Sequence, residues 1–136
     1  MQDPQTVASP IGFNRPPAVA DSSALDLTLR ALRPILSDRE VTEICINRPG
    51  EAYIETRAGW HCVPIAFATF EWCSSLARLV ANSTRQRIDA ESPLLSAALP
   101  GGERIQIVLP PATTPGTVAI TIRRPADEVW TLGELE

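Results

Sequence analysis

Apolar residues recur with a helical period near the start of the chain. In "DSSALDLTLRALRPILSD", residues 21–38, leucines stand at i, i+4, i+7 and i+11, which is one stripe of a helix. These leucines are Leu25, Leu29, Leu32 and Leu36. The Asp-Ser-Ser that opens the run is typical of a helix N-cap. Pro34 is expected to kink or end the helix, because proline lacks the backbone donor and crowds the preceding turn.

The run "TFEWCSSLARLVANSTRQ", residues 69–86, has the clearest amphipathic pattern of the chain. Thr69 is the expected N-cap, and Glu71 falls in the first turn, where the helix dipole favours a negative charge. The predicted apolar face comprises Phe70, Cys73, Leu76, Ala77 and Val80. We therefore expect this segment to pack on the core as a helix.

Between and after these helices, apolar residues alternate with polar ones, which is the period of β-strands. Residues 40–66 hold three short runs separated by "NRPG" and "RAGW", a pattern typical of an antiparallel meander. Strand character returns after "RQRIDAESP" and lasts to residue 123. The order of helix, meander, helix and strands predicts an α+β domain, a mostly antiparallel β-sheet with helices packed on it.

The stretch "SAALPGGERIQIVLPPATTPGTVAITIRRP", residues 96–125, predicts a hairpin followed by one more strand. Its Pro-Gly-Gly turn supplies the positive φ that tight turns need and pairs "PLLSAAL" with "ERIQIVL". The runs "ERIQIVL" and "VAITIR" each place three apolar residues on one face of a strand. They are Ile105, Ile107 and Leu109 on the first, and Val118, Ile120 and Ile122 on the second.

An antiparallel register that matches these two faces sets Ile107 opposite Ile120. Arg104 then lies across from Arg123, on the face away from the core, with Cβ atoms about 5 Å apart. Like charges so placed are destabilising, whereas a phosphate between the two guanidinium groups would bind both and reverse that effect. Arg124 has the opposite parity, which favours Arg123 over it as the second anion ligand and leaves Arg124 as a third candidate for the nucleotide phosphates. A register shifted by two residues would separate the pair, and exposed arginines that keep a sheet soluble are the simpler alternative.

The composition is that of one globular domain. The 136 residues carry a net charge of −4, which argues against a duplex-DNA surface, because such a surface needs a basic face. Residues 1–22 are rich in proline and predict a disordered arm, whereas residues 126–136 resemble a linker toward a further domain. No run fits a signal peptide or approaches the ~20 apolar residues of a spanning helix, so a cytoplasmic location is expected.

The sequence contains no motif for independent catalysis. It has no G-x-x-x-x-G-K-[ST] phosphate loop, no H-E-x-x-H and no G-x-S-x-G. His61 is interpreted as structural, and Asp89 and Glu91 as the solvated surface of a polar loop. The three cysteines form no C-x-x-C pair and are expected to be small core residues in a reducing compartment.

Three segments together resemble a known family. "DREVTEICINRPGEAYIE", "SPLLSAALPGGERIQIVLPP" and "VAITIRRP" are similar to the N-terminal domain of the VirB-operon type of traffic ATPase, found in type IV secretion and conjugative transfer systems. The resemblance covers residues ~25–125, and its most specific part is "LPxGERIQIVxPP...ITIRxP". It implies a PAS-like α+β domain over residues 23–125, joined by a linker to a RecA-like domain that carries the phosphate loop.

The resemblance also implies a site and partners. In that family nucleotide lies between the two domains, and the "GER" and "I-x-I-R" arginines, which match Arg104 and Arg123, reach its phosphates. ATP is the implied cofactor, with Mg²⁺ held by the RecA-like domain, which is missing from this sequence. The implied partners are a homo-oligomer, a hexamer in the full-length protein, and other type IV secretion components. Peripheral association with the cytoplasmic face of the inner membrane is implied as well. Direct binding of nucleic acid is not expected.

Without the phosphate loop, these residues are not expected to hydrolyse ATP alone. A second hypothesis is a non-catalytic α+β interaction or sensor module whose arginines bind a protein partner or an anionic surface. Single-stranded nucleic-acid binding ranks last, because the aromatic residues that stack on bases make up only 5% of the chain. A phosphate-loop sequence following these residues in the gene would favour the ATPase hypothesis over the interaction module.

Overall fold

The leucine stripe forms a helical run that changes type just before its proline. In the computed structural model, which describes residues 23–125, α1 (Ser23–Leu29) passes through the 3₁₀ turn η3 (Arg30–Leu32) into α2 (Arg33–Leu36). Pro34 lies in the first turn of α2, where its missing donor leaves no helical bond unmade. The α-helix is therefore interrupted by a 3₁₀ turn just before Pro34, where a kink or an end was predicted. The arm predicted for residues 1–22 and the linker predicted for residues 126–136 lie outside the described residues.

The remaining elements follow the predicted order. They are β1 (Glu43–Arg48), β2 (Glu51–Thr56), β3 (Gly59–Pro64), α3 (Phe70–Thr84), β4 (Leu94–Ala98), β5 (Arg104–Val108) and β6 (Ala119–Arg123). All pairings in the six-stranded sheet are antiparallel, and the strand order is β3-β2-β1-β6-β5-β4. Two three-stranded units, β1–β3 and β4–β6, are thus joined by the non-local pairing of β1 with β6.

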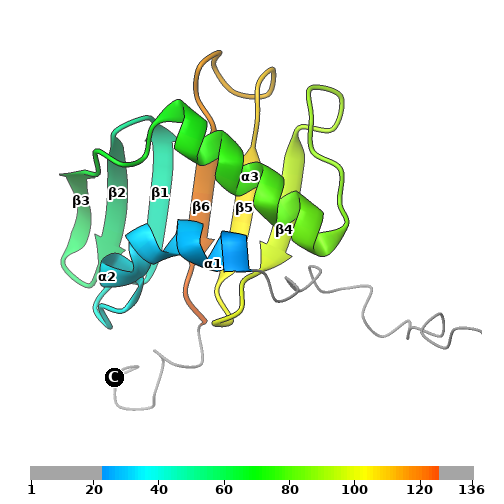
Figure 1. Ribbon diagram of the computed structural model, residues 1–136. Helices are drawn as coiled ribbons and strands as arrows, with labels where there is room; N and C mark the ends of the chain where they lie inside the picture. Colours follow the sequence, from blue (N-terminus) through cyan, green and yellow to red (C-terminus); the bar gives the residue numbers. More distant parts are fainter. Residues whose placement is uncertain (1–22, 126–136) are drawn as a thin grey trace, which may run out of the picture.

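The helices lie on one face of this sheet and leave the other face open (Figure 1). The core between the two layers contains the four leucines of the stripe, all at most 4% exposed, and the inward isoleucines of β1, β5 and β6. This α+β layering is the predicted fold class. No helix in residues 23–125 is long and apolar enough to cross a membrane.

Helix α3 begins as predicted, but its buried face differs by one residue at each end. The Thr69 hydroxyl accepts a hydrogen bond from the Trp72 backbone N–H at 3.0 Å, which is an N-cap bond. Phe70, predicted to be buried, is 38% exposed, and Ala81 joins the buried face instead. Phe70 is the first residue of α3, and the first turn of that helix lies near the ends of the strands (Figure 1).

The cysteines do not all lie in the core. Cys73 on α3 is buried, whereas Cys45 is half-buried and Cys62 is exposed. Alternation along β1 and β3 places Cys45 and Cys62 on the helix-free face, so the expectation of three core cysteines was wrong for these two. Burial raises the pKa of the Cys73 thiol to about 11.

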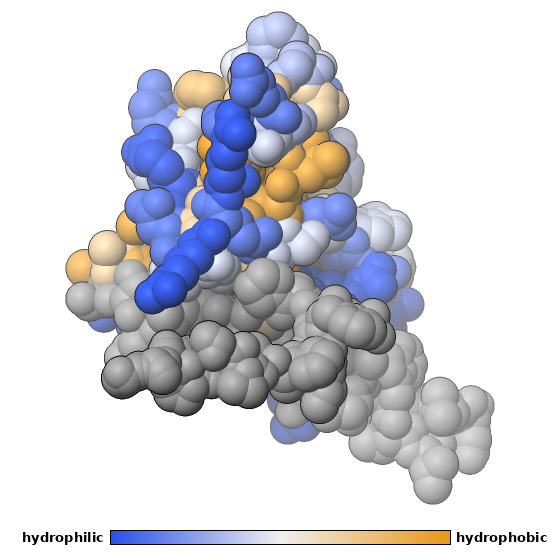
Figure 2. Space-filling view, turned by 90° about the vertical axis from the view of Figure 1, so that its right-hand side faces the viewer, coloured by the Kyte–Doolittle hydropathy of each residue, from blue (hydrophilic) through white to orange (hydrophobic). Residues whose placement is uncertain are grey.

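The two edges of the sheet are β3 and β4. Seen from the β4 end, hydrophilic side chains lie against an apolar area (Figure 2), and Leu94 of β4 is 58% exposed. Gln86, which follows α3, donates its side-chain amide to the Ser96 carbonyl at 2.9 Å. That bond satisfies one main-chain acceptor of an edge strand. Unpaired main-chain groups at a sheet edge can otherwise pair with a strand of another chain.

Candidate functional site

Arg104 and Arg123 face each other across β5 and β6. The register pairs Arg104 with Arg123, Ile105 with Ile122 and Ile107 with Ile120, as the apolar pattern predicted. Both arginines are exposed, and the isoleucines are buried under the helices. The two arginine side chains therefore start from directly opposite positions on the helix-free face, a placement of like charges that is unfavourable unless an anion offsets it.

The β4–β5 hairpin turn and the end of β6 form a hollow of about 440 Å³ beside this pair. Its lining comprises Gly102, Arg104, Arg123, Arg124 and Pro125, so the structure brings all three predicted arginines to one place. Gly102 has φ of 96°, and a Cβ added there would lie 3.4 Å from the ring of Pro125. Glycine therefore suits both the turn and the close approach of β6's continuation.

A second hollow, of about 450 Å³, adjoins the pair on the helix-free face. Its polar lining includes Ser96, Gln106 and Thr121, which form the next row of side chains across β4, β5 and β6. Hydroxyl and amide groups of this kind can donate to and accept from a polar ligand. The arginine pair thus lies between two concave surfaces rather than on a flat sheet.

Arg123 has a partner that the sequence did not indicate. Its Nη2 donates to Glu43 Oε1 at 3.1 Å, and Glu43 stands directly opposite it on β1. The Glu43 side chain is only 13% exposed, compared with 69% for Arg123. Strand alternation could have placed Glu43 on the helix-free face, but the β1–β6 pairing joins residues 80 positions apart and leaves no local signal.

Arg124 has a different environment from the other two arginines. Its guanidinium Nη1 donates to the Leu36 carbonyl at the end of α2, and its backbone N–H donates to the Thr42 carbonyl at 3.0 Å. Its Nε is buried and has no hydrogen-bond partner within residues 23–125. Arg124 therefore connects the end of β6 to the end of α2, where a cation also suits the helix dipole.

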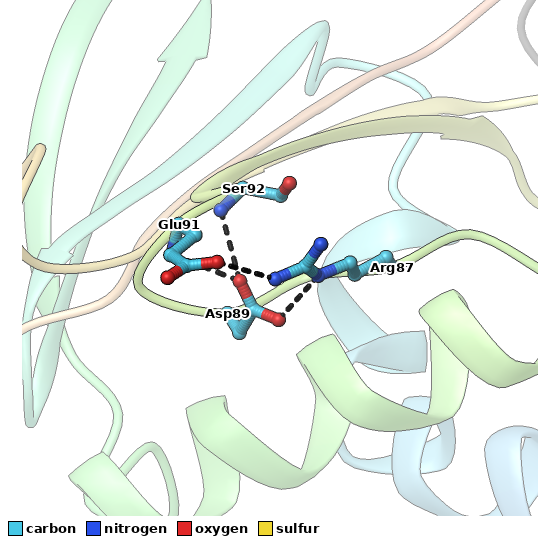
Figure 3. Close-up of polar contacts among 4 residues, drawn as sticks. All are labelled: Arg87, Asp89, Glu91 and Ser92. Atoms are coloured by element: carbon cyan, nitrogen blue, oxygen red, sulfur yellow. Dashed lines mark hydrogen bonds and ion pairs between the residues drawn. The ribbon is translucent and has the colours of Figure 1, made fainter.

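Ion pairs and hydrogen bonds link the residues of the acidic loop between α3 and β4 (Figure 3). Arg87 donates to Asp89 at 2.6 Å and to Glu91 at 2.9 Å, and Asp89 also accepts from the Ser92 backbone N–H at 2.9 Å. The Arg87 guanidinium lowers the pKa of the Asp89 carboxyl. These carboxylates are solvent-exposed and bound within their own loop, which agrees with their interpretation as surface.

His61 is the one histidine of the chain, and the sequence pattern predicts a structural role for it. The exposed His61 Nε2 lies 3.1 Å from the Thr56 hydroxyl, a contact between neighbouring strands that agrees with a structural role. Among the described residues, no three His, Cys, Asp or Glu side chains gather in a way that could hold a metal ion. The arrangement at the arginine pair can therefore bind and neutralise an anion.

Comparison with known proteins gives several close relatives, although no family model matches the chain. The type IV secretion system protein PtlH of Bordetella pertussis is 46% identical over 113 residues, which cover 83% of this chain and 33% of that protein. The type IV secretion system protein VirB11 of Brucella suis is 42% identical over 109 residues, covering 80% of this chain and 30% of that protein. The chain thus spans about a third of the length of the curated relatives it matches.

A solved structure agrees with the sequence relatives. The crystal structure of the VirB11 ATPase from the Brucella suis type IV secretion system, in complex with sulphate, superposes with a TM-score of 0.76 and 41% sequence identity. The match covers 82% of this chain and 33% of that one. The similarity therefore extends over most of the sheet and helices described above.

Proposed function

The chain is homologous to the N-terminal region of type IV secretion ATPases of the VirB11 and PtlH family, and from this premise we propose that it forms their nucleotide-clamping, ring-forming domain. In this proposal Arg104 and Arg123 contact the phosphates of ATP. The full-length protein would couple ATP binding and hydrolysis to substrate transfer or pilus assembly. The observation that carries the proposal is the direct pairing of Arg104 with Arg123 on the helix-free face.

The chemistry follows from the two guanidinium groups. Each presents a planar, cationic fork of N–H donors that matches phosphate oxygens. In phosphoryl transfer, negative charge grows on the transferred group, so a positioned arginine stabilises the transition state more than the ground state. The solved Brucella relative is in complex with sulphate, a tetrahedral anion like phosphate, which is compatible with this role.

In this proposal the domain supplies only part of the nucleotide site, namely the two arginines. The phosphate loop and the Mg²⁺ ligands would come from the RecA-like domain of the full-length protein, and closure of the two domains on nucleotide would complete the site. The isolated chain should therefore bind ATP weakly. Hexamer formation, contact with other secretion components and peripheral association with the inner membrane belong to the same proposal. Homology to secretion ATPases favours it over an interaction or sensor module.

The test is ATP hydrolysis by the full-length protein. We expect Arg104→Ala and Arg123→Ala each to lower turnover by at least ~100-fold, toward the range known for removed arginine fingers. Arg78→Ala, on the exposed side of α3, is the matched control because it removes the same charge from the opposite layer. Wild-type turnover in both site variants would contradict the assignment.

A further inference from the structure

One row of side chains crosses the helix-free face in a line of four charges. The strand registers set Glu55 of β2 opposite Glu43 of β1, Glu43 opposite Arg123 of β6, and Arg123 opposite Arg104 of β5. Two neighbouring carboxylates are thus followed by two neighbouring guanidinium groups. Like charges directly opposite each other are unfavourable, and in this row only the central pair, Glu43 with Arg123, brings opposite charges together.

The four members of the row are engaged to different degrees. Glu43 uses both oxygens, because Oε1 accepts from Arg123 at 3.1 Å and Oε2 accepts from the Cys45 thiol at 3.5 Å. Glu55 accepts a hydrogen bond from the Thr42 hydroxyl at 3.1 Å. Within residues 23–125, no hydrogen bond or ion pair engages the Arg104 side chain. One arginine of the pair is therefore available, and the other is held by a carboxylate.

We propose that Glu43 is an internal competitor of the phosphate, a residue that holds Arg123 beside β1 and sets the phosphate affinity of the half-site. This inference rests on the proposed function, since it names what controls the same arginine pair. A phosphate that binds between Arg104 and Arg123 has to draw the Arg123 guanidinium from Glu43 or share it. It must also approach a carboxylate that is largely shielded from water, where repulsion between negative charges is less screened than in solution.

The arrangement has a functional consequence. Glu43 by itself cancels one of the two positive charges that the arginine pair would otherwise present to a ligand. Phosphate should then bind weakly to this domain and tightly only when the second half of the site adds its own donors. Glu43 thereby makes retention of nucleotide depend on domain closure, and it returns Arg123 to β1 when the phosphate leaves.

The experiment is a calorimetric titration of the 136-residue chain with inorganic tripolyphosphate. We expect Glu43→Gln to bind it ~5- to 10-fold more tightly than the wild type, because glutamine keeps the shape and a hydrogen-bond acceptor but removes the competing charge. Glu55→Gln is the matched control, since it removes the same charge from the same row one strand farther away. We expect it to change the affinity less than ~2-fold.

The two outcomes that overturn the inference are distinct from failure of the proposed function. Unchanged or weaker binding by Glu43→Gln, or an equal gain in Glu55→Gln, refutes a specific role of Glu43. A loss of folding cannot imitate the expected result, because a misfolded variant does not gain affinity. Arg104→Ala in the same titration tests the phosphate site itself, and its binding should weaken even if Glu43 proves irrelevant. Wild-type affinity in Arg104→Ala would refute the phosphate site.

Discussion

The two faces of the sheet are formed by alternate residues of the same strands, yet they differ in composition and in role. On β6, Ile122 is fully buried against the helices, and the next residue, Arg123, is exposed and ion-paired. The covered face is apolar throughout β1, β5 and β6, whereas the open face carries the charged row and polar hollows. Stability should therefore depend on one face and anion binding on the other, which substitutions can separate.

The largest expected effect comes from the covered face. Ile120 is 1% exposed and lies opposite Ile107 in the middle of the sheet. We expect Ile120→Ala to lower the free energy of unfolding by ~2–5 kcal/mol, because the truncation loses apolar burial and leaves a cavity. Thr121→Ala, one residue away on the open face, should cost less than ~1 kcal/mol. Urea unfolding of both variants measures the difference, and equal losses would show that the faces are not separable.

Local patterns in the sequence predicted most of the fold. Helical spacing gave the leucine stripe and α3, and alternation gave the register that sets Arg104 opposite Arg123, because each of these depends on residues close in sequence. The one misplaced side chain of α3, Phe70, lies at a helix end, where burial depends on how far the opposing layer extends.

The parts of the site that could not be predicted depend on non-local contacts. Glu43 reaches Arg123 only because β1 pairs with β6, and no hairpin links those strands. The same pairing brings Thr42 and Leu36 to Arg124 and so separates its environment from that of its neighbour. Spacing identified three arginines at one end of the sheet, and parity set Arg124 apart from the other two. Only the tertiary structure shows that Arg123 is bound by Glu43 and Arg124 by the Leu36 carbonyl.

The next effect tests the different environments of Arg104 and Arg124 by replacing each of them with lysine. Lysine keeps the charge of arginine but loses the planar fork. We expect Arg124→Lys to lower the free energy of unfolding by ~1–2 kcal/mol, because the bond to the Leu36 carbonyl is weakened in a partly buried place. Arg104→Lys should leave stability within ~0.5 kcal/mol of the wild type but weaken tripolyphosphate binding, since Arg104 is exposed.

Urea unfolding and calorimetric titration of both variants check this pair of predictions. Phosphate affinity in Arg124→Lys should stay within about twofold of the wild type, because the charge remains and only its attachment to α2 changes. If Arg124→Lys instead loses affinity as Arg104→Lys does, Arg124 acts with the other two arginines as a phosphate ligand. Both lysine variants retain the net charge, so neither result can be attributed to a change in long-range attraction.

The smallest expected effect concerns a cysteine of the covered side. Burial raises the pKa of Cys73 to about 11 from an ordinary value of 9.0. The folded protein then keeps the thiol proton to higher pH than the unfolded chain does, so this contribution to stability is complete below pH ~9 and is lost as the pH rises toward 11. Between pH 8 and 10, we expect the wild type to lose ~1 kcal/mol more unfolding free energy than Cys73→Ala. Urea unfolding at both pH values, with reductant present, measures this difference. Equal losses in the two proteins would show that the Cys73 thiol ionises as readily in the folded chain as in the unfolded one.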